Sequence, residues 1–404
     1  MASPDSSAIP AMVRMLRLSN GWSQRQLAGY AGLSSSTVSR IERGLRSADN
    51  RHVAERLAHA LGCSVTELTG AEPVSRARAC DAACLKLRQS LVATSLDEIA
   101  PSVPWHLGRL IAAAEQVRAL RDRCAYAAAA RAAAECLVRA HALPARRTRG
   151  QRLSILARLC FDAAFAVNSL GDGGTAWIAA DRCMAAAAMA GEPTLRDGSV
   201  YARARVALSE DAPGRASRLA HAVLENNPGL AQNPDRAAAH GMLHLTAAFS
   251  AVRGNPADVV HADEHLSGAA DVAYRLAESA TSGSDPLGLD FNSATVALSR
   301  LIVALDVGDL QAATSAEREV APAVLTLHRQ AVYHVTIARL MCALGRSDDA
   351  VQSLGRAQRL APEALKALRP AQPLATTLME EKLSAAGRRR LRALSERMEW
   401  TFTG

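Results

Sequence analysis

Apolar residues in the first seventy positions recur every three or four residues, and a glycine or an Asn-Gly pair separates the runs. This spacing places apolar side chains on one face of a helix. The breaks at residues 20–21, Gly32, Gly44 and Gly62 predict five short helices in a compact domain. The inward residues of the first four helices are Val13, Leu16, Leu27, Ala28, Ala31, Val38, Ile41, Val53, Leu57 and Leu61.

Helix-capping residues stand at these breaks. Ser23 and Gln26 have the spacing of a capping box for the second helix, and Ser34 is the expected N-cap of the third. The other predicted boundaries are Pro10 opening the first helix, Gly44 ending the third, Asp49 capping the fourth, and Ser64 with Glu67 starting the fifth.

Helical patterns continue almost without interruption after a short linker at residues 71–76. Clusters of Gly, Pro, Asp and Ser break residues 77–404 into segments of ordinary helix length, and no useful length alternates with period two. Aromatic residues make up only 3% of the chain, so alanine and leucine must supply most of the packing. The sequence therefore predicts an all-α protein in two parts, residues 1–70 and residues 77–404.

The stretch ARLMCALGRSDDAVQSLGRAQRLAP, residues 338–362, carries a repeat signature. Its small residues and its turn glycine have the spacing of a tetratricopeptide unit, in which paired helices approach closely. The positions are Ala338, Gly345, Ala350, Leu354, Ala357 and Pro362, and the turn-plus-alanine part recurs at Gly171/Ala176 and Gly308/Ala313. Residues 77–404 are predicted to stack as degenerate helix pairs with a concave face, and an unrelated helical bundle is the alternative.

The net charge of +8 rests on arginine, because lysine occurs only at positions 86, 366 and 382. A basic excess favours a polyanionic partner, although an arginine-rich coding bias gives the same total. The eight cysteines form no CxxC pair and are interpreted as buried reduced thiols. No apolar run approaches the roughly 20 residues of a membrane span, and the polar start lacks a signal-peptide core. We expect a cytoplasmic protein with no membrane partner.

The stretches LRLSNGWSQRQLAGYAGLSSSTVSRIERG and LAHALGCSVTEL closely resemble the Xre-type, lambda-repressor-like helix-turn-helix family. The resemblance implies a five-helix domain at residues 1–70, whose third helix enters the major groove of double-stranded DNA. It also implies an ion pair between Arg17 and Glu42. The residues that would contact DNA are Gln24 beside a phosphate, Ser35, Ser36 and Arg40 at base edges, and Thr37, Arg43 and Arg46 at the sugar–phosphate backbone.

The third helix begins with four small hydroxyl residues, SSST at 34–37. Short side chains let the N-terminus of the helix approach the duplex, where hydroxyls and amides can bind phosphates. Serine discriminates bases poorly, so Arg40 is expected to carry most of the direct readout, at O6 and N7 of a guanine. The alternative is a small helical bundle whose third helix is simply solvated.

Three stretches of the second part resemble actinobacterial regulators that fuse such a helix-turn-helix to tetratricopeptide-like repeats. They are TAWIAADRCMAAAAMAG, DFNSATVALSRLIVALDVGDL and the repeat signature with its continuation. The architecture is also similar to the peptide-pheromone receptors of Gram-positive bacteria, whose repeat groove binds a signal. The resemblance implies a domain at residues 77–404 that dimerises and senses a small-molecule or peptide effector.

Candidate effector contacts are polar or bulky residues on otherwise alanine-rich helices. A groove lined by arginines and an amide can hold a carboxylate or a peptide backbone. Ion pairs between helices and core aromatic rings are the alternative interpretation of the same residues. The candidates are Trp177, Asp181, Arg182, Arg203, Phe291, Asn292 and Arg300.

The pentapeptide HADEH at 261–265 matches the H-x-x-E-H zinc-protease motif. His261 and His265 would be the ligands and Glu264 the general base. A five-residue match is a weak signal, and no third ligand stands out downstream. We expect no metal, no cofactor and no enzymatic activity, and keep a zinc hydrolase as a remote alternative.

Together these features predict a sequence-specific transcriptional regulator. One module makes too few contacts for operator affinity, so we expect a homodimer on half-sites about one helical turn apart. A second hypothesis is an adaptor whose repeats recruit a protein partner to DNA.

Overall fold

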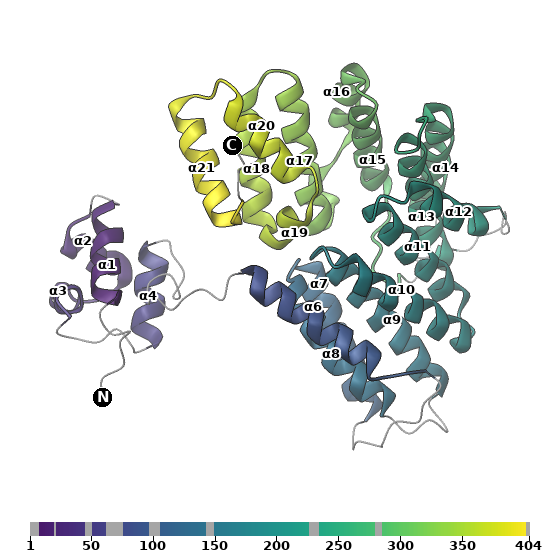
Figure 1. The fold of residues 1–404 in the computed structure, drawn as a ribbon, viewed down its shortest axis with the longest axis horizontal. Helices are drawn as coiled ribbons and strands as arrows, with labels where there is room; N and C mark the ends of the chain where they lie inside the picture. Colours follow the sequence, from purple (N-terminus) through teal and green to yellow (C-terminus); the bar gives the residue numbers. More distant parts are fainter. Residues whose placement is uncertain are drawn as a thin grey trace. The chain divides into compact units, whose positions relative to one another are not determined.

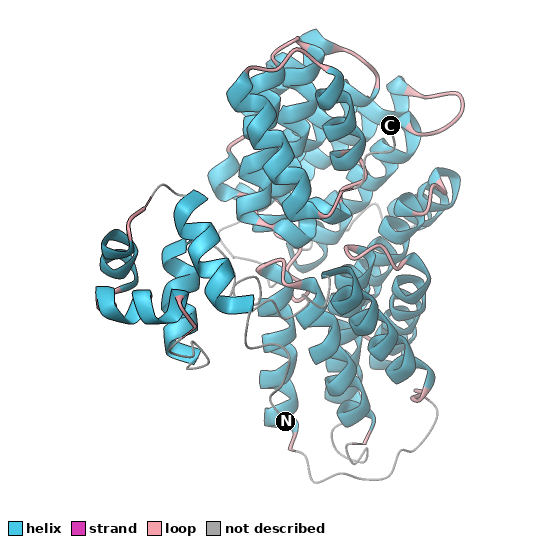
Figure 2. Cartoon of the chain, turned by 60° about the vertical axis from the view of Figure 1, so that its left-hand side comes forward, coloured by secondary structure: helices cyan, strands magenta, loops and turns pink. Residues whose placement is uncertain are grey.

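The computed structural model describes residues 8–19, 22–44, 51–61, 76–96, 106–142, 149–225, 234–278 and 285–400. Every regular element in these ranges is a helix, as Figures 1 and 2 show from two directions. The predicted all-α class is confirmed. Contacts between Cα atoms divide the chain into a first unit, Met1–Asp81, and a second unit, Ala82–Gly404.

The first unit contains α1 (Ala8–Ser19), α2 (Gln24–Ala31), α3 (Ser35–Glu42) and α4 (Arg51–Leu61). Five side chains of its core are fully buried, those of Val13, Leu27, Val38, Ile41 and Leu57. Helix α1 begins at Ala8 rather than at Pro10. The predicted cap at Asp49 and the predicted fifth helix from Ser64 lie outside the described residues.

The second unit is a series of helices that pack against their neighbours in the chain. Helix α6 (Arg76–Val92) crosses the boundary between the units. The others are α7 (Leu107–Asp122), α8 (Tyr126–His141), α9 (Arg149–Asn168), α10 (Gly173–Ala190), α11 (Pro193–Ser209), α12 (Pro213–Leu224), α13 (Pro234–Val252), α14 (Val259–Glu278), α15 (Ser293–Asp306), α16 (Leu310–Glu319), a 3-10 turn (Pro322–Val324), α17 (Leu327–Ala343), α18 (Ser347–Leu360), α19 (Pro362–Ala367), α20 (Ala371–Glu380) and α21 (Ala385–Met398).

The helix pair predicted around the repeat signature is α17 with α18. Gly345 in the turn has a φ of +72°, a left-handed conformation that favours glycine. The small side chains of Ala338 and Ala350 are fully buried between the paired helices. The pattern of a left-handed glycine followed by a buried alanine recurs at Gly171/Ala176 and Gly308/Ala313.

Helices near the start of the second unit also contact helices near its end. The Tyr126 hydroxyl lies 2.7 Å from Nδ1 of His328, and the Ala127 N–H donates to the Glu363 carboxylate at 3.0 Å. Tyr126 belongs to a hydrophobic cluster that also contains Ala331 and Ala364. In an open solenoid each repeat contacts only its neighbours. The second unit departs from that expectation because its series of helices closes on itself.

Candidate DNA-binding surface and central cavity

The start of α3 is organised by Ser34. This residue has extended backbone angles, and its hydroxyl oxygen accepts the N–H of Thr37 at 3.1 Å, so the predicted N-cap is confirmed. The hydroxyls of Ser36 and Thr37 lie 2.9 and 2.8 Å from the same oxygen. Ser34, Ser35 and Ser36 are all exposed. The first turn of α3 therefore presents hydroxyl groups and backbone amides, and no bulky side chain.

Arg40 lies on α3 beyond this slim first turn, and its side chain is exposed. No described residue forms a hydrogen bond or an ion pair with its guanidinium, so its donors are available to a ligand. Arg43 is also exposed, and its Nε donates to the Ser39 carbonyl at 3.2 Å. Arg25, which the sequence reasoning did not single out, is exposed in the first turn of α2. Arg46 lies outside the described residues.

A buried ion pair fixes α1 against α3. Arg17 Nε lies 2.6 Å from Glu42 Oε1, and the two side chains are 9% and 3% exposed. Arg17 also donates to the Trp22 carbonyl at 2.7 Å, and Gln24 donates to Glu42 Oε2 at 2.8 Å. Burial raises the pKa of Glu42, but the hydrogen bonds from Arg17 and Gln24 outweigh it and hold that pKa below its usual value. The ion pair implied by the resemblance is confirmed, and the neutral Gln24 amide donates a hydrogen bond to its carboxylate.

A helix-turn-helix family model matches residues 13–68. The match identifies a helix-turn-helix domain, to which α1, α2, α3 and α4 belong. The match covers the capped third helix and the ion pair, and it supports a DNA-binding transcriptional regulator. No curated protein and no solved structure matches the chain. None of the described helices combines the length and the low polarity that crossing a bilayer requires.

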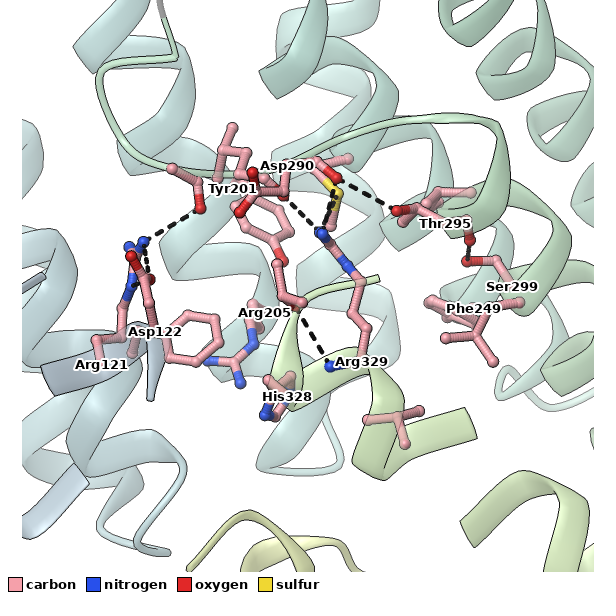
Figure 3. A pocket seen from close by; sticks show the side chains of 18 of the residues that line it. Arg121, Asp122, Tyr201, Arg205, Phe249, Asp290, Thr295, Ser299, His328 and Arg329 are labelled. Atoms are coloured by element: carbon pink, nitrogen blue, oxygen red, sulfur yellow. Dashed lines mark hydrogen bonds and ion pairs between the residues drawn. The ribbon is translucent and has the colours of Figure 1, made fainter. Parts of the chain in front are cut away.

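A cavity of about 160 Å³ lies in the second unit, among α7, α9, α11, α13, α15 and α17. Tyr201, Arg205 and His328 occupy the middle of the view in Figure 3, between Arg121 on one side and Arg329 on the other. Apolar side chains complete the wall and include Phe161, Phe165, Leu245, Phe249, Leu298, Ile302 and Val332. The cavity therefore combines cationic groups with an apolar wall.

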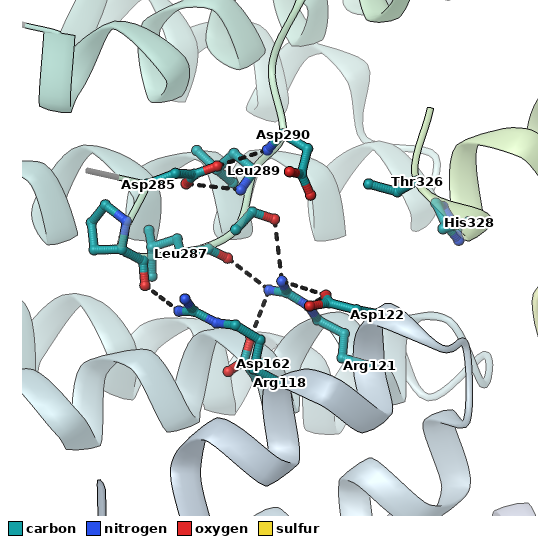
Figure 4. Close-up of polar contacts among 12 residues, drawn as sticks. Arg118, Arg121, Asp122, Asp162, Asp285, Leu287, Leu289, Asp290, Thr326 and His328 are labelled. Carbon is teal, nitrogen blue, oxygen red and sulfur yellow. Dashed lines mark hydrogen bonds and ion pairs between the residues drawn. The ribbon is translucent and has the colours of Figure 1, made fainter. Parts of the chain in front are cut away.

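Residues 285–290 border the cavity through Gly288, Leu289 and Asp290, and arginines from two helices hold this segment by its backbone; Figure 4 shows two of them, Arg118 and Arg121. Five consecutive carbonyls accept guanidinium hydrogen bonds. The pairs are Arg118 to Pro286, Arg121 to Leu287 (2.8 Å) and Gly288 (3.1 Å), and Arg329 to Leu289 (2.6 Å) and Asp290 (2.9 Å). We call residues 285–290 the arginine-held segment.

The three arginines at the cavity differ in their charge partners. Arg121 is buried and lies 2.6 Å from the buried Asp162 carboxylate, and it also pairs with Asp122 at 2.8 Å. Arg329 donates to carbonyls, and its burial lowers the pKa of the guanidinium, an effect that nearby Asp290 offsets only in part. Arg205 stacks 3.9 Å above the Phe165 ring centroid and makes no ion pair with any described residue.

His328 remains uncharged beside these arginines. Burial lowers the pKa of His328 to about 3, with further lowering by Arg205, Arg329 and Arg121. Its Nδ1 lies 2.7 Å from the Tyr126 hydroxyl. With Tyr126 as the donor, the ring carries its hydrogen on Nε2, which is then a donor for a bound ligand.

Three of the predicted effector residues form a cluster on α10 and α11, away from the cavity. The Arg203 guanidinium lies 5.0 Å from the Trp177 ring centroid and 3.5 Å from the Asp181 carboxylate. The Asp181 side chain is 63% exposed, and Trp177 packs against Ala204 and neighbouring apolar residues. This arrangement matches the alternative interpretation, in which they link neighbouring helices.

The other four candidates make separate local contacts. These are Arg182 to the Thr94 hydroxyl (2.8 Å), the buried Phe291 against Gly241, Asn292 capping α15 through the Thr295 N–H (3.0 Å), and Arg300 near Glu319 (3.8 Å). None of the seven candidates lines the central cavity. A role for them in effector binding stays a prediction.

The histidines of the zinc-protease motif have different partners. His261 is exposed and pairs with Asp258 at 2.7 Å. His265 Nδ1 lies 3.1 Å from His244 Nδ1, and its Nε2 lies 3.2 Å from His221 Nε2. Glu264 is exposed on α14. Within the described part of the chain, no group of three or more His, Cys, Asp or Glu side chains is arranged to hold a metal ion.

None of the residues that line the cavity was predicted from the sequence. Tyr201 and Arg205 stand four residues apart in YARARVAL, a spacing that puts both on one face of α11. His328 and Arg329 are adjacent basic residues at the start of α17. These local signals were present, but nothing in the sequence links α11 to a helix more than a hundred residues away.

Proposed function

We propose that the chain is a cytoplasmic transcriptional regulator that binds double-stranded DNA as a homodimer and senses an effector through its second unit. The observation that carries the DNA-binding part is Arg40, whose exposed guanidinium has no partner among the described residues. It lies on a helix whose first turn carries only small side chains. An exposed planar donor fork of this kind suits O6 and N7 of guanine. Ser35, Ser36 and Thr37 lie beside it for contacts to bases and phosphates.

Selection of bound sequences from random double-stranded DNA tests this reading. We expect the parent chain to enrich one motif, and the Arg40→Ala variant to lose its preference at one base pair in each half-site. Equal enrichment by the two proteins would contradict the role of Arg40.

We infer the homodimer from the affinity that binding to an operator requires. A single helix-turn-helix module covers about one half-site, and operator-like binding uses two of them about 10–10.5 base pairs apart. The enriched motif should therefore be a pair of half-sites at that spacing. Light scattering that gives a monomer both alone and on DNA would overturn the dimer.

The sensing role of the second unit is supported by its cavity. A concave site with convergent polar groups on an apolar wall is the usual form of a small-molecule site. A ligand acts on DNA binding only if it favours one state of the protein over another. DNA affinity measured with and without a bound ligand is the direct test, and ligand binding that leaves DNA affinity unchanged would contradict sensing.

The adaptor hypothesis assigns the second unit to a protein partner instead. Capture of one stoichiometric partner, with no ligand-dependent change in DNA affinity, would favour it.

We also propose that the chain acts by binding and not by catalysis. Stoichiometric zinc in protein purified without chelators would revive the hydrolase alternative.

A further inference from the structure

The charge balance of the cavity leaves Arg205 without a counter-ion among the described residues. Arg121 is neutralised by Asp162, and Arg329 is held by the carbonyls of the arginine-held segment. Within the described part of the chain, the only hydrogen bond from Arg205 reaches the Ser169 hydroxyl at 3.4 Å. A guanidinium in such surroundings is costly unless an anion accompanies it. Arg205 is partly exposed and lines the cavity, so that anion can enter from there.

Two further donors lie next to Arg205. Tyr201 is one turn earlier on α11 and lines the same cavity, and its hydroxyl bonds to no described residue. His328 also lines the cavity, and Nε2 is its free ring nitrogen when Tyr126 occupies Nδ1. Charge-assisted bonds from a guanidinium, with a phenol and an imidazole as neutral donors, match the two oxygens of a carboxylate.

The rest of the cavity sets the size and the polarity of the ligand. At about 160 Å³ it is smaller than the pockets of roughly 300–1,000 Å³ that hold drug-sized molecules. A protein cavity of about 150 Å³ is known to accept benzene. The rings of Phe161 and Phe249 with Leu298 and Ile302 favour an apolar or aromatic body.

We propose that the central cavity binds a small organic monocarboxylate, with its carboxylate at Arg205, Tyr201 and His328 and its apolar body toward Phe249. The proposal names the ligand class for the sensing function proposed above and rests on it. The arginine-held segment forms part of the same wall through Gly288, Leu289 and Asp290. A carboxylate that draws on Arg329 would therefore compete with the carbonyls that hold this segment in place.

Calorimetric titration of the full chain with matched pairs of probes tests the ligand class. The pairs are benzoate with benzamide, phenylacetate with phenylacetamide, and isovalerate with isovaleramide, which differ chiefly in charge. We expect at least one carboxylate to bind about tenfold or more tightly than its amide, because charge-assisted bonds are stronger than neutral ones. Equal binding within every pair, or no binding by any carboxylate at millimolar concentration, would overturn the proposal.

Variants locate the site. Arg205→Met should weaken the preferred carboxylate at least about tenfold and leave its amide nearly unchanged, whereas Arg131→Met, on the exposed face of α8, should change neither. Arg205→Met should also raise the melting temperature of the free protein, because it removes an unpaired charge. If this variant does not fold, Arg205→Lys keeps the charge but loses the fork, and it should still weaken the carboxylate. Unchanged carboxylate affinity in the folded variant would overturn the site.

DNA affinity separates the two proposals. A carboxylate that binds at Arg205 and does not alter DNA affinity would leave the ligand class standing and contradict sensing. A neutral ligand or a peptide that alters DNA affinity while carboxylates do not bind would leave sensing standing and contradict the ligand class.

Discussion

The two units of this protein each contain a buried arginine–carboxylate pair of the same length, and they use it differently. Arg17 and Glu42 lie 2.6 Å apart in the helix-turn-helix domain, 25 residues from each other in the chain. Arg121 and Asp162 also lie 2.6 Å apart, but Arg121 reaches on to carbonyls 166 and 167 residues away. The first pair holds α1 against α3. The second connects α7 and α9 to the arginine-held segment, at the edge of the cavity.

The consequence is a difference in where the free cations lie. In the helix-turn-helix domain the arginines that can act on a ligand, such as Arg40, are on the surface. In the second unit Arg205 is only partly exposed and lines the cavity. A guanidinium on the surface can bind an extended polyanion. A guanidinium that lines a cavity selects a small anion whose hydration shell can be removed.

The largest expected effect comes from breaking the buried pair of the second unit. Arg121→Met leaves Asp162 buried without a partner and frees two carbonyls, so we expect a loss of about 3–5 kcal/mol in the free energy of unfolding. Urea denaturation followed by circular dichroism measures it. The matched variant Arg17→Met should abolish DNA binding and leave most of the helical signal intact. A large loss of helix in Arg17→Met would show that the two units do not unfold separately.

The second largest effect should be a loss of stability of the second unit at low pH. Burial lowers the pKa of His328 to about 3 and that of His244 to about 4, against about 6.5 in an unfolded chain. The unfolded chain therefore binds protons that the folded chain does not. The contribution of these two buried rings to the free energy of unfolding is complete above pH 6.5 and is lost as the pH falls toward 4. For each of these histidines, the free energy of unfolding falls by about 1.4 kcal/mol per pH unit in that range. Urea midpoints at pH 7.5, 6.5 and 5.5 test this, and a flat profile down to pH 5.5 would contradict the burial of these rings.

Surface arginines of the helix-turn-helix domain should separate specificity from affinity. Arg40→Ala is expected to lose about 1–3 kcal/mol of discrimination at one base pair without changing the melting temperature. Arg43→Ala should weaken all sequences alike and reduce the salt slope by about one. Binding titrations on the preferred site and a single-base mismatch, at two salt concentrations, make the comparison. Loss of discrimination in Arg43→Ala would exchange the two roles.

The smallest effect concerns the cap of α3. Ser34→Ala removes the acceptor of the Thr37 N–H and should cost about 1 kcal/mol of stability, with a partial loss of DNA affinity. Ser34→Asp keeps an acceptor and should retain most of the stability, but its charge would repel phosphate. Equal DNA binding by Ser34→Ala and the parent protein would show that the cap is not needed to present the helix.

The sequence predicted the helix-turn-helix domain more fully than the cavity for a physical reason. The Ser34 cap, the Gly32 turn and the apolar positions of α3 act within a few residues, so their spacing can be read along the chain. Arg17 and Glu42 came from the resemblance alone. The cavity residues Tyr201 and His328 lie on helices that only the closure of the second unit brings together, and arginines chosen for their alanine-rich surroundings were found in pairs between helices.

The row of histidines on α12, α13 and α14 has one more implication. His221 Nδ1 lies 2.8 Å from the Ser217 carbonyl, which can only accept, so His221 carries its hydrogen on Nδ1. Its Nε2 must then accept from His265, whose Nδ1 must in turn accept from His244. A single main-chain oxygen therefore dictates the tautomer of three imidazoles on three helices, and all their N–H bonds run in one direction along the row.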